Sequence, residues 1–142
     1  MNAIRLVAVF AENKPGQTAA ITKILADANI NIRWVTVVNS GGFGVMKFLV
    51  SDCELAHQAL RHQGLVASLL QVLAVEVPDR PGALQAVAEC LARESINLES
   101  ASGFVANHRA ILVLELRDLV PARAALEKQG LRVLTQEEML NL

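Results

Sequence analysis

The chain repeats itself with a constant offset of 66 residues, and this repeat limits what it can fold into. Aligning positions 5–68 with positions 71–134 pairs 64 residues without a gap, and 16 of these pairs are identical. The identical pairs include Pro15 with Pro81, Gly16 with Gly82 and Asp52 with Asp118. Such a repeat indicates two copies of one supersecondary unit. We therefore predict two domains, residues 1–69 and residues 70–142.

Each copy alternates strand and helix patterns in the same order. The elements expected in the first copy are a strand at 4–11, a helix ending at Asn29, strands at 32–38 and 43–50 around a turn at 39–42, a helix at 52–62 and a strand at 65–70. This order is that of the ferredoxin-like fold, in which right-handed crossovers place both helices on one face of an antiparallel sheet. We predict an α+β protein made of two tandem ferredoxin-like βαββαβ domains. A Thr135/Glu138 capping-box pattern predicts a short closing helix.

A Pro-Gly turn lies in both copies where the first strand gives way to a helix. Backbone amides at a helix start lack intrahelical acceptors and favour a small anion such as a carboxylate. Glycine lets a ligand approach the backbone, so the amides of residues 17 and 18, or of 83 and 84, can hold that carboxylate. A side-chain oxygen of Asn13, Asn31, Asp79 or Asn97 can accept from an ammonium group. Each turn could equally be a tight strand-to-helix connection without a ligand.

The two Pro-Gly turns, the Ile30-Asn31 and Ile96-Asn97 steps before the second strands and the βαββαβ order resemble the ACT domain. Nearly the whole chain is similar to stand-alone tandem ACT proteins. The resemblance implies a regulatory protein that binds an amino acid or a similar small metabolite at an interface between ACT domains. Ala11 stands where a serine-binding relative has histidine, which argues against serine. The ligand-binding residues implied are Asn13, Gly16, Gln17 and Asn31 in the first copy, and Asp79, Gly82, Ala83 and Asn97 in the second. The helix-start amide of Leu84 adds that residue to the expected site.

Charge favours the second copy as the ligand site. Asp79 adds a formal negative charge beside its helix start, whereas the equivalent Asn13 is neutral. A charged acceptor makes the stronger hydrogen bond to an ammonium group. We therefore expect a zwitterionic amino acid against Asp79, Gly82 and Asn97, with its side chain held by the neighbouring domain.

Composition argues against several other classes of protein. The net charge is −1, and no run of five like charges suggests a nucleic-acid partner. Cys53 and Cys90 are isolated, and His57, His62 and His108 show no metal-ligand spacing and are expected to be solvated surface residues. The longest apolar stretch, 65–75, is interrupted by polar residues and is too short to cross a bilayer. We expect a cytoplasmic protein that is not an enzyme and binds no metal or cofactor.

The strands are apolar on both alternating faces, so something must cover the second face of each sheet. Two small domains of this kind favour a homodimer, and a regulated partner protein is a further candidate. Two alternatives stay open. One is an assembly module that joins proteins and binds no metabolite. The other is a small ferredoxin-like enzyme such as an acylphosphatase, although that activity needs an arginine among glycines in its loop and only Arg80 is in place.

Overall fold

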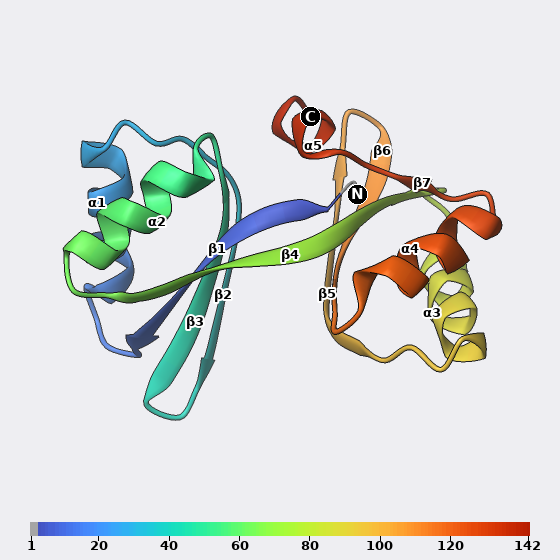
Figure 1. The fold of residues 1–142 in the computed structure, drawn as a ribbon, viewed down its shortest axis with the longest axis horizontal. Coiled ribbons are helices and arrows are strands. Elements are labelled where there is room, and N and C mark those ends of the chain that lie inside the picture. The colour runs from blue at the N-terminus through green and yellow to red at the C-terminus, as the bar shows by residue number, and fades with distance from the viewer. Residues whose placement is uncertain (1–2) are drawn as a thin grey trace. The chain divides into compact units, whose positions relative to one another are not determined.

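The fold is seen in a computed structural model that describes residues 3–142 (Figure 1). The chain divides into two compact units. The N-terminal unit holds residues 5–70, and the C-terminal unit holds residues 71–142 together with residues 3 and 4. The division falls inside strand β4, Val66–Val77, which begins in the N-terminal unit and ends in the C-terminal unit.

The N-terminal unit has the predicted element order. Its elements are β1 (Ile4–Glu12), α1 (Gln17–Asp27), β2 (Ile32–Ser40), β3 (Phe43–Val50), α2 (Cys53–His62) and the start of β4. Across the sheet the strands run β2-β3-β1-β4. Strand β3 is antiparallel to both β1 and β2, so β1 and β2 point the same way. The ferredoxin-like order expected from the sequence is confirmed in this unit.

The core of the N-terminal unit lies between its sheet and helices α1 and α2. Alternate residues of β1 and β3, such as Val9 and Phe48, are buried beside Ile21 and Leu25 of α1 and Leu60 of α2. This follows from the two periodicities, since every second residue of a strand and every third or fourth residue of a helix point to one side. The sheet is thereby held against both helices, and the loop between β1 and α1 is fixed at one end of it.

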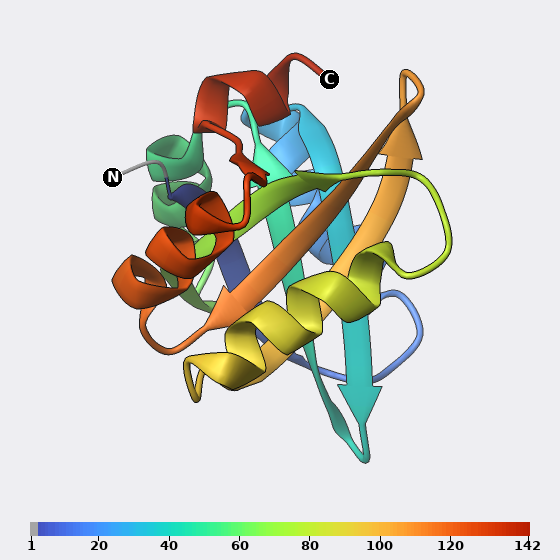
Figure 2. The same ribbon diagram turned by 90° about the vertical axis from the view of Figure 1, so that its right-hand side faces the viewer.

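The C-terminal unit repeats this arrangement. Its elements are the rest of β4, α3 (Ala83–Arg93), β5 (Leu98–Ala106), β6 (Arg109–Leu116), α4 (Leu119–Lys128), β7 (Arg132–Val133) and α5 (Gln136–Leu140). The strand order β5-β6-β4-β7 matches β2-β3-β1-β4 of the N-terminal unit. Figure 2 shows α3 and α4 lying across one face of these strands. Two tandem ferredoxin-like βαββαβ units are therefore confirmed as the fold.

The closing helix α5 lies on the other face of the C-terminal sheet, opposite α3 and α4 (Figure 1). The Thr135 hydroxyl accepts a hydrogen bond from the Glu138 amide at 3.1 Å, which confirms the predicted cap. Met139 of α5 is buried. Arg132 of β7 reaches Glu138 at 2.6 Å, so an ion pair ties this helix to the strand before it.

Some side chains differ from expectation. His57 is not fully solvated, because its ring lies partly buried on α2 with Nε2 3.1 Å from the Ala67 carbonyl oxygen. Cys53 begins α2 and Cys90 is buried, and both are free thiols. Burial raises the pKa of the Cys53 thiol. No helix within residues 3–142 is long and apolar enough to cross a membrane.

Candidate ligand-binding site

The first Pro-Gly loop, residues 13–16, joins β1 to α1 and is exposed throughout. The Asn13 amide donates to the carbonyl oxygen of Gly42 at 2.8 Å, which ties the loop to the β2–β3 hairpin. Gly16 caps α1 with a left-handed backbone, φ 85°, and no side-chain hydrogen bond. A residue with a Cβ adopts that conformation only with strain. The turn itself therefore requires glycine, whether or not a ligand approaches it.

The amide groups at this helix start are partly in use. The Gln17 amide donates to the Lys14 carbonyl oxygen at 3.2 Å, closing the turn, so it is not available to a ligand in this conformation. The next amides, of Thr18 and Ala19, belong to the first helical turn, where N–H groups have no intrahelical acceptor. An anion at this site would therefore meet residues 18 and 19 instead of 17 and 18.

A small pocket of about 30 Å³ lies beside the first loop. It has room for one small group, such as a water molecule or one end of a ligand. Asn39 of β2 bends over Gly44 of β3 here, since a Cβ added at Gly44 would lie 2.0 Å from Asn39 Oδ1. Six of the ten lining residues have polar or charged side chains. The lining residues are Ala11, Glu12, Asn13, Lys14, Gln17, Thr18, Val37, Asn39, Gly44 and Met46.

The second loop, residues 79–82, has the same backbone and different surroundings. Gly82 is left-handed, φ 91°, and the Ala83 amide donates to the Arg80 carbonyl oxygen at 3.3 Å. The helix-start amides that remain are those of Leu84 and Gln85. Three polar side chains of the pocket lining have apolar equivalents here, whereas Asn13 and Lys14 are replaced by the charged Asp79 and Arg80. Ala83, Leu84, Val105 and Ala110 replace Gln17, Thr18, Asn39 and Gly44.

Asn31 and Asn97 lie far from the loops of their own units. In the N-terminal unit, β1 ends opposite Phe43, which also lies opposite the end of β2, whereas Asn31 precedes the start of β2. The separation is about one strand length, roughly 30 Å for the nine residues of β2 at 3.3 Å per residue. In the C-terminal unit the strands pair in the equivalent register, so Asn97 lies a similar distance from Gly82. Within one unit, the structure does not bring either asparagine to a Pro-Gly loop.

Several pocket residues were not predicted from the sequence. Glu12, Lys14, Val37, Asn39, Gly44 and Met46 line the pocket as well. Their signal was present in the expected fold, because β1 and β2 are parallel strands on either side of β3 and end at the same end of the sheet. The end of β2 at Asn39 therefore comes beside the loop that follows β1. Within residues 3–142, no group of three or more His, Cys, Asp or Glu side chains could hold a metal ion.

The two units, each with a glycine-capped helix after its first strand, match one known family. The model of the ACT domain pair matches residues 2–142, essentially the whole chain. The chain belongs to the ACT domain pair family. The resemblance noted in the Pro-Gly turns and the Ile-Asn steps is thereby confirmed.

Known proteins similar to this ACT pair differ in length. The ACT domain-containing protein ACR3 of Arabidopsis thaliana is 27% identical over 163 residues; the match covers 96% of this chain and only 36% of that protein. The crystal structure of protein BT0572 from Bacteroides thetaiotaomicron has a TM-score of 0.92 at 26% identity, covering 99% and 98% of the two chains. The regulatory subunit of aspartate kinase from Thermus thermophilus, in a ligand-free form, has a TM-score of 0.62 at 17% identity, covering 90% and 93%.

Proposed function

We propose that this ACT pair is a non-catalytic regulatory protein that binds an amino acid or a similar small metabolite. The observation that carries the proposal is the pairing of two glycine-capped helix starts in a chain that the ACT pair family covers from residue 2 to 142. A structural relative is named as the regulatory subunit of aspartate kinase, which is in keeping with such a role.

The ligand would be a zwitterion. Its carboxylate would meet the free amides at the start of α1 or α3, where the helix dipole favours negative charge. Its ammonium group would meet Asn13 Oδ1 or the Asp79 carboxylate, both exposed beside those helix starts. The ligand would gain charge-assisted hydrogen bonds at both ends of its backbone.

The two loops offer different advantages. Asp79 gives the second loop a formal charge, while the first loop has the polar pocket with Gln17 and Asn39 in its lining. The pocket can orient a polar group by several hydrogen bonds, and orientation is what a small ligand site needs most. We propose that the first loop binds the more polar ligand and that the second loop binds through Asp79.

The position of Asn31 and Asn97 supports a homodimer. Each asparagine lies about one strand length from the loop of its own unit, so either can complete a ligand site only at a loop from another unit or another chain. A ligand held between chains would couple binding to assembly, which is the basis of regulation by mass action. The regulated partner would then bind the assembled form of the protein and not the single chain.

A thermal-shift screen of the full chain against the twenty amino acids, one at a time, tests the proposal. A ligand that binds only the folded state raises the unfolding temperature once its concentration exceeds Kd. At one hundred times Kd it adds about 2.7 kcal/mol to the free energy of unfolding. We expect one amino acid, or a few of related chemistry, to stabilise the protein. No shift with any of them at millimolar concentration would reject an amino-acid ligand and favour an assembly module.

A further inference from the structure

The sheet face of the N-terminal unit that points away from α1 and α2 carries a cluster of exposed apolar side chains. We name it the Phe43 patch; it consists of the exposed Phe10, Val38, Phe43 and Val66 together with Val45, which is half-buried. The exposed fractions are 48% for Phe10, 64% for Val38, 70% for Phe43 and 67% for Val66. Exposed apolar groups that lie together in this way mark an interaction site more often than single ones do.

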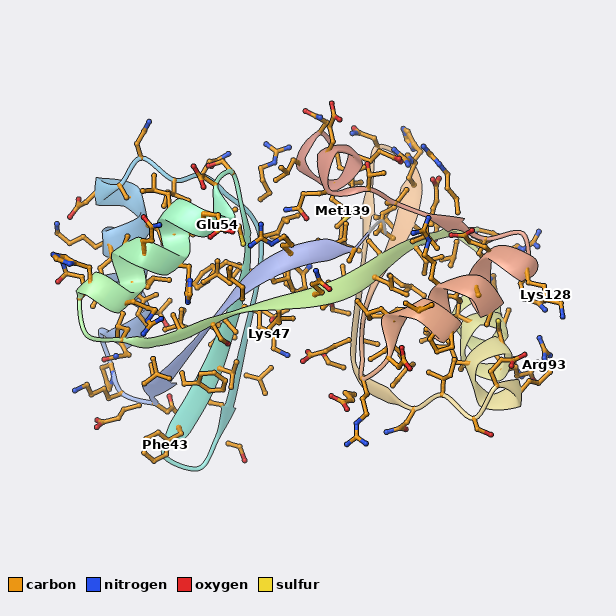
Figure 3. The ribbon with its side chains drawn as sticks, in the orientation of Figure 1. Phe43, Lys47, Glu54, Arg93, Lys128 and Met139 are labelled. Carbon is orange, nitrogen blue, oxygen red and sulfur yellow. The ribbon has the colours of Figure 1, made fainter. Side chains whose placement is uncertain are left out.

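The strand register makes the patch continuous. Phe10 of β1 lies opposite Val45 of β3, which lies opposite Val38 of β2, so these three form a row across three strands. Phe43 stands two residues before Val45 on β3 and therefore on the same face. Figure 3 shows the Phe43 side chain at the tip of the β2–β3 hairpin.

Aligning the two copies of the repeat shows that this surface is apolar in the N-terminal unit and charged at the equivalent positions of the C-terminal unit. The C-terminal residues equivalent to Phe10, Phe43 and Val66 are Glu76, Arg109 and Arg132. These three are charged and joined to one another, with Arg109 and Glu76 at 2.8 Å and Arg132 and Glu76 at 3.7 Å. Helix α5 is anchored to this cluster by the Arg132–Glu138 pair. One unit therefore places its own helix over this position, and the other presents bare apolar side chains there.

We propose that the Phe43 patch is the surface through which two copies of this chain associate, face to face across a twofold axis. This rests on the homodimer of the proposed function and names its contact surface. A twofold contact brings the same patch from both chains together, so the patch must be complementary to itself. An apolar centre with two aromatic rings meets that condition, and aromatic side chains dominate interface energies.

The charges at the edge of the patch also favour a second copy over a charged partner. Glu12 lies opposite Phe43 in the register, and Lys14 lies 3.6 Å from Glu12. One acid and one base at the same edge can pair with their counterparts across a twofold axis. A strongly acidic partner would be repelled by Glu12, and a strongly basic partner would be repelled by Lys14.

The area is of the right order for a dimer. The two phenylalanines expose on the order of 200 Å² if a full aromatic side chain counts as about 200 Å². With the three valines the patch reaches roughly 400 Å², within the range of the largest functional patches on monomers. A stable interface buries about 800 Å² on each partner, so the patch would be its centre and the surrounding strand surface would be its edge.

Sedimentation equilibrium of the full chain, without any amino acid, tests the proposal. The parent protein should have twice the chain mass of 15.3 kDa. Phe43→Asp and Val66→Asp each place a charge inside the patch and should convert the dimer to monomers. In each variant the dissociation constant of the dimer should rise at least tenfold. Val120→Asp is the matched control, because Val120 on α4 is 65% exposed and outside the patch. Circular dichroism checks that each variant is folded, and Val66→Asp keeps the test valid if Phe43→Asp does not fold.

Each outcome decides a different point. A parent mass of one chain at 100 micromolar would reject both the homodimer and its contact surface. A dimeric parent whose Phe43→Asp and Val66→Asp variants stay dimeric would retain the homodimer and overturn the patch. Dissociation by Val120→Asp to the same extent would also overturn the patch. Because no ligand is present, none of these results depends on whether a Pro-Gly loop binds an amino acid.

Discussion

Arg109 of β6 donates two hydrogen bonds to Glu76 of β4, from Nε to Oε2 at 3.1 Å and from Nη2 to Oε1 at 2.8 Å. This forked geometry is the strongest arrangement between a guanidinium and a carboxylate. The hydrogen bonds from Arg109 lower the pKa of the Glu76 carboxyl below its ordinary value, and Arg132 at 3.7 Å adds to the effect. The pair anchors the strand end to which β7 and α5 are attached.

The Glu76–Arg109 pair should make the free energy of unfolding of the C-terminal unit fall at acidic pH. A carboxyl whose pKa is lowered by folding contributes stability that is fully present above its unfolded-state pKa and is lost as the pH falls through the folded-state pKa. The parent should therefore exceed Glu76→Gln in urea stability at pH 7, and the difference should shrink below pH 4.5, the ordinary value for this carboxyl. A difference that stays constant from pH 7 to pH 3 would show that the ion pair contributes nothing.

The two equivalent aspartates at helix starts should differ in their contribution to stability. Asp52 accepts a hydrogen bond from the Leu55 amide at 3.0 Å, whereas Asp118, at the matching position before α4, has no side-chain cap bond. Loss of a capping side chain costs about 1 kcal/mol. We expect Asp52→Ala to lower the free energy of unfolding by about that amount, and Asp118→Ala to change it by less than about 0.5 kcal/mol. Equal losses in denaturant melts would show that capping is not the cause.

The glycines of the two Pro-Gly loops should be required for stability without any ligand. Gly16 and Gly82 are left-handed, and a Cβ at either position would touch nothing within 4 Å, so the cost of Ala is backbone strain alone. That cost is about 1 to 2 kcal/mol. Gly42→Ala is the control, because Gly42 has neither a left-handed backbone nor a neighbour within 4 Å. If all three alanine variants unfold at the same denaturant concentration as the parent, the strain argument fails.

Changes at Asn13 and Asp79 should separate the two loops as ligand sites. Once a binding amino acid is known, calorimetry on Asp79→Asn should show a loss of about 1 to 3 kcal/mol at the second loop, the scale for a charged hydrogen-bond partner. Asn13→Ala should weaken binding at the first loop, whose pocket Asn13 lines. Unchanged affinity and stoichiometry in both variants would place the ligand outside the Pro-Gly loops. Both side chains are exposed, so neither change should alter the fold.

Local sequence patterns predicted most of the backbone. The helix start at Asp52, the helix end beside Asn29 (φ 58°) and the Thr135 cap of α5 all occur where the sequence placed them. These features depend on residues within a few positions of one another, so their chemistry is visible in the linear sequence. Of the two amides expected to hold a carboxylate, those of residues 17 and 18, the Gln17 amide already donates to the Lys14 carbonyl within the turn itself.

The sequence by itself determined the repeat, the order of strands and helices, the two glycine-capped turns and the family, because each depends on spacing or on local backbone chemistry. Only the tertiary structure decided that Asn31 lies a strand length from Gly16, that Asn39 reaches the first loop over Gly44, and that Phe10 and Phe43 are exposed where Glu76 and Arg109 form an ion pair. Those relationships depend on strand register. Register is set by packing between distant segments, and it decides which of two alternating faces each side chain occupies.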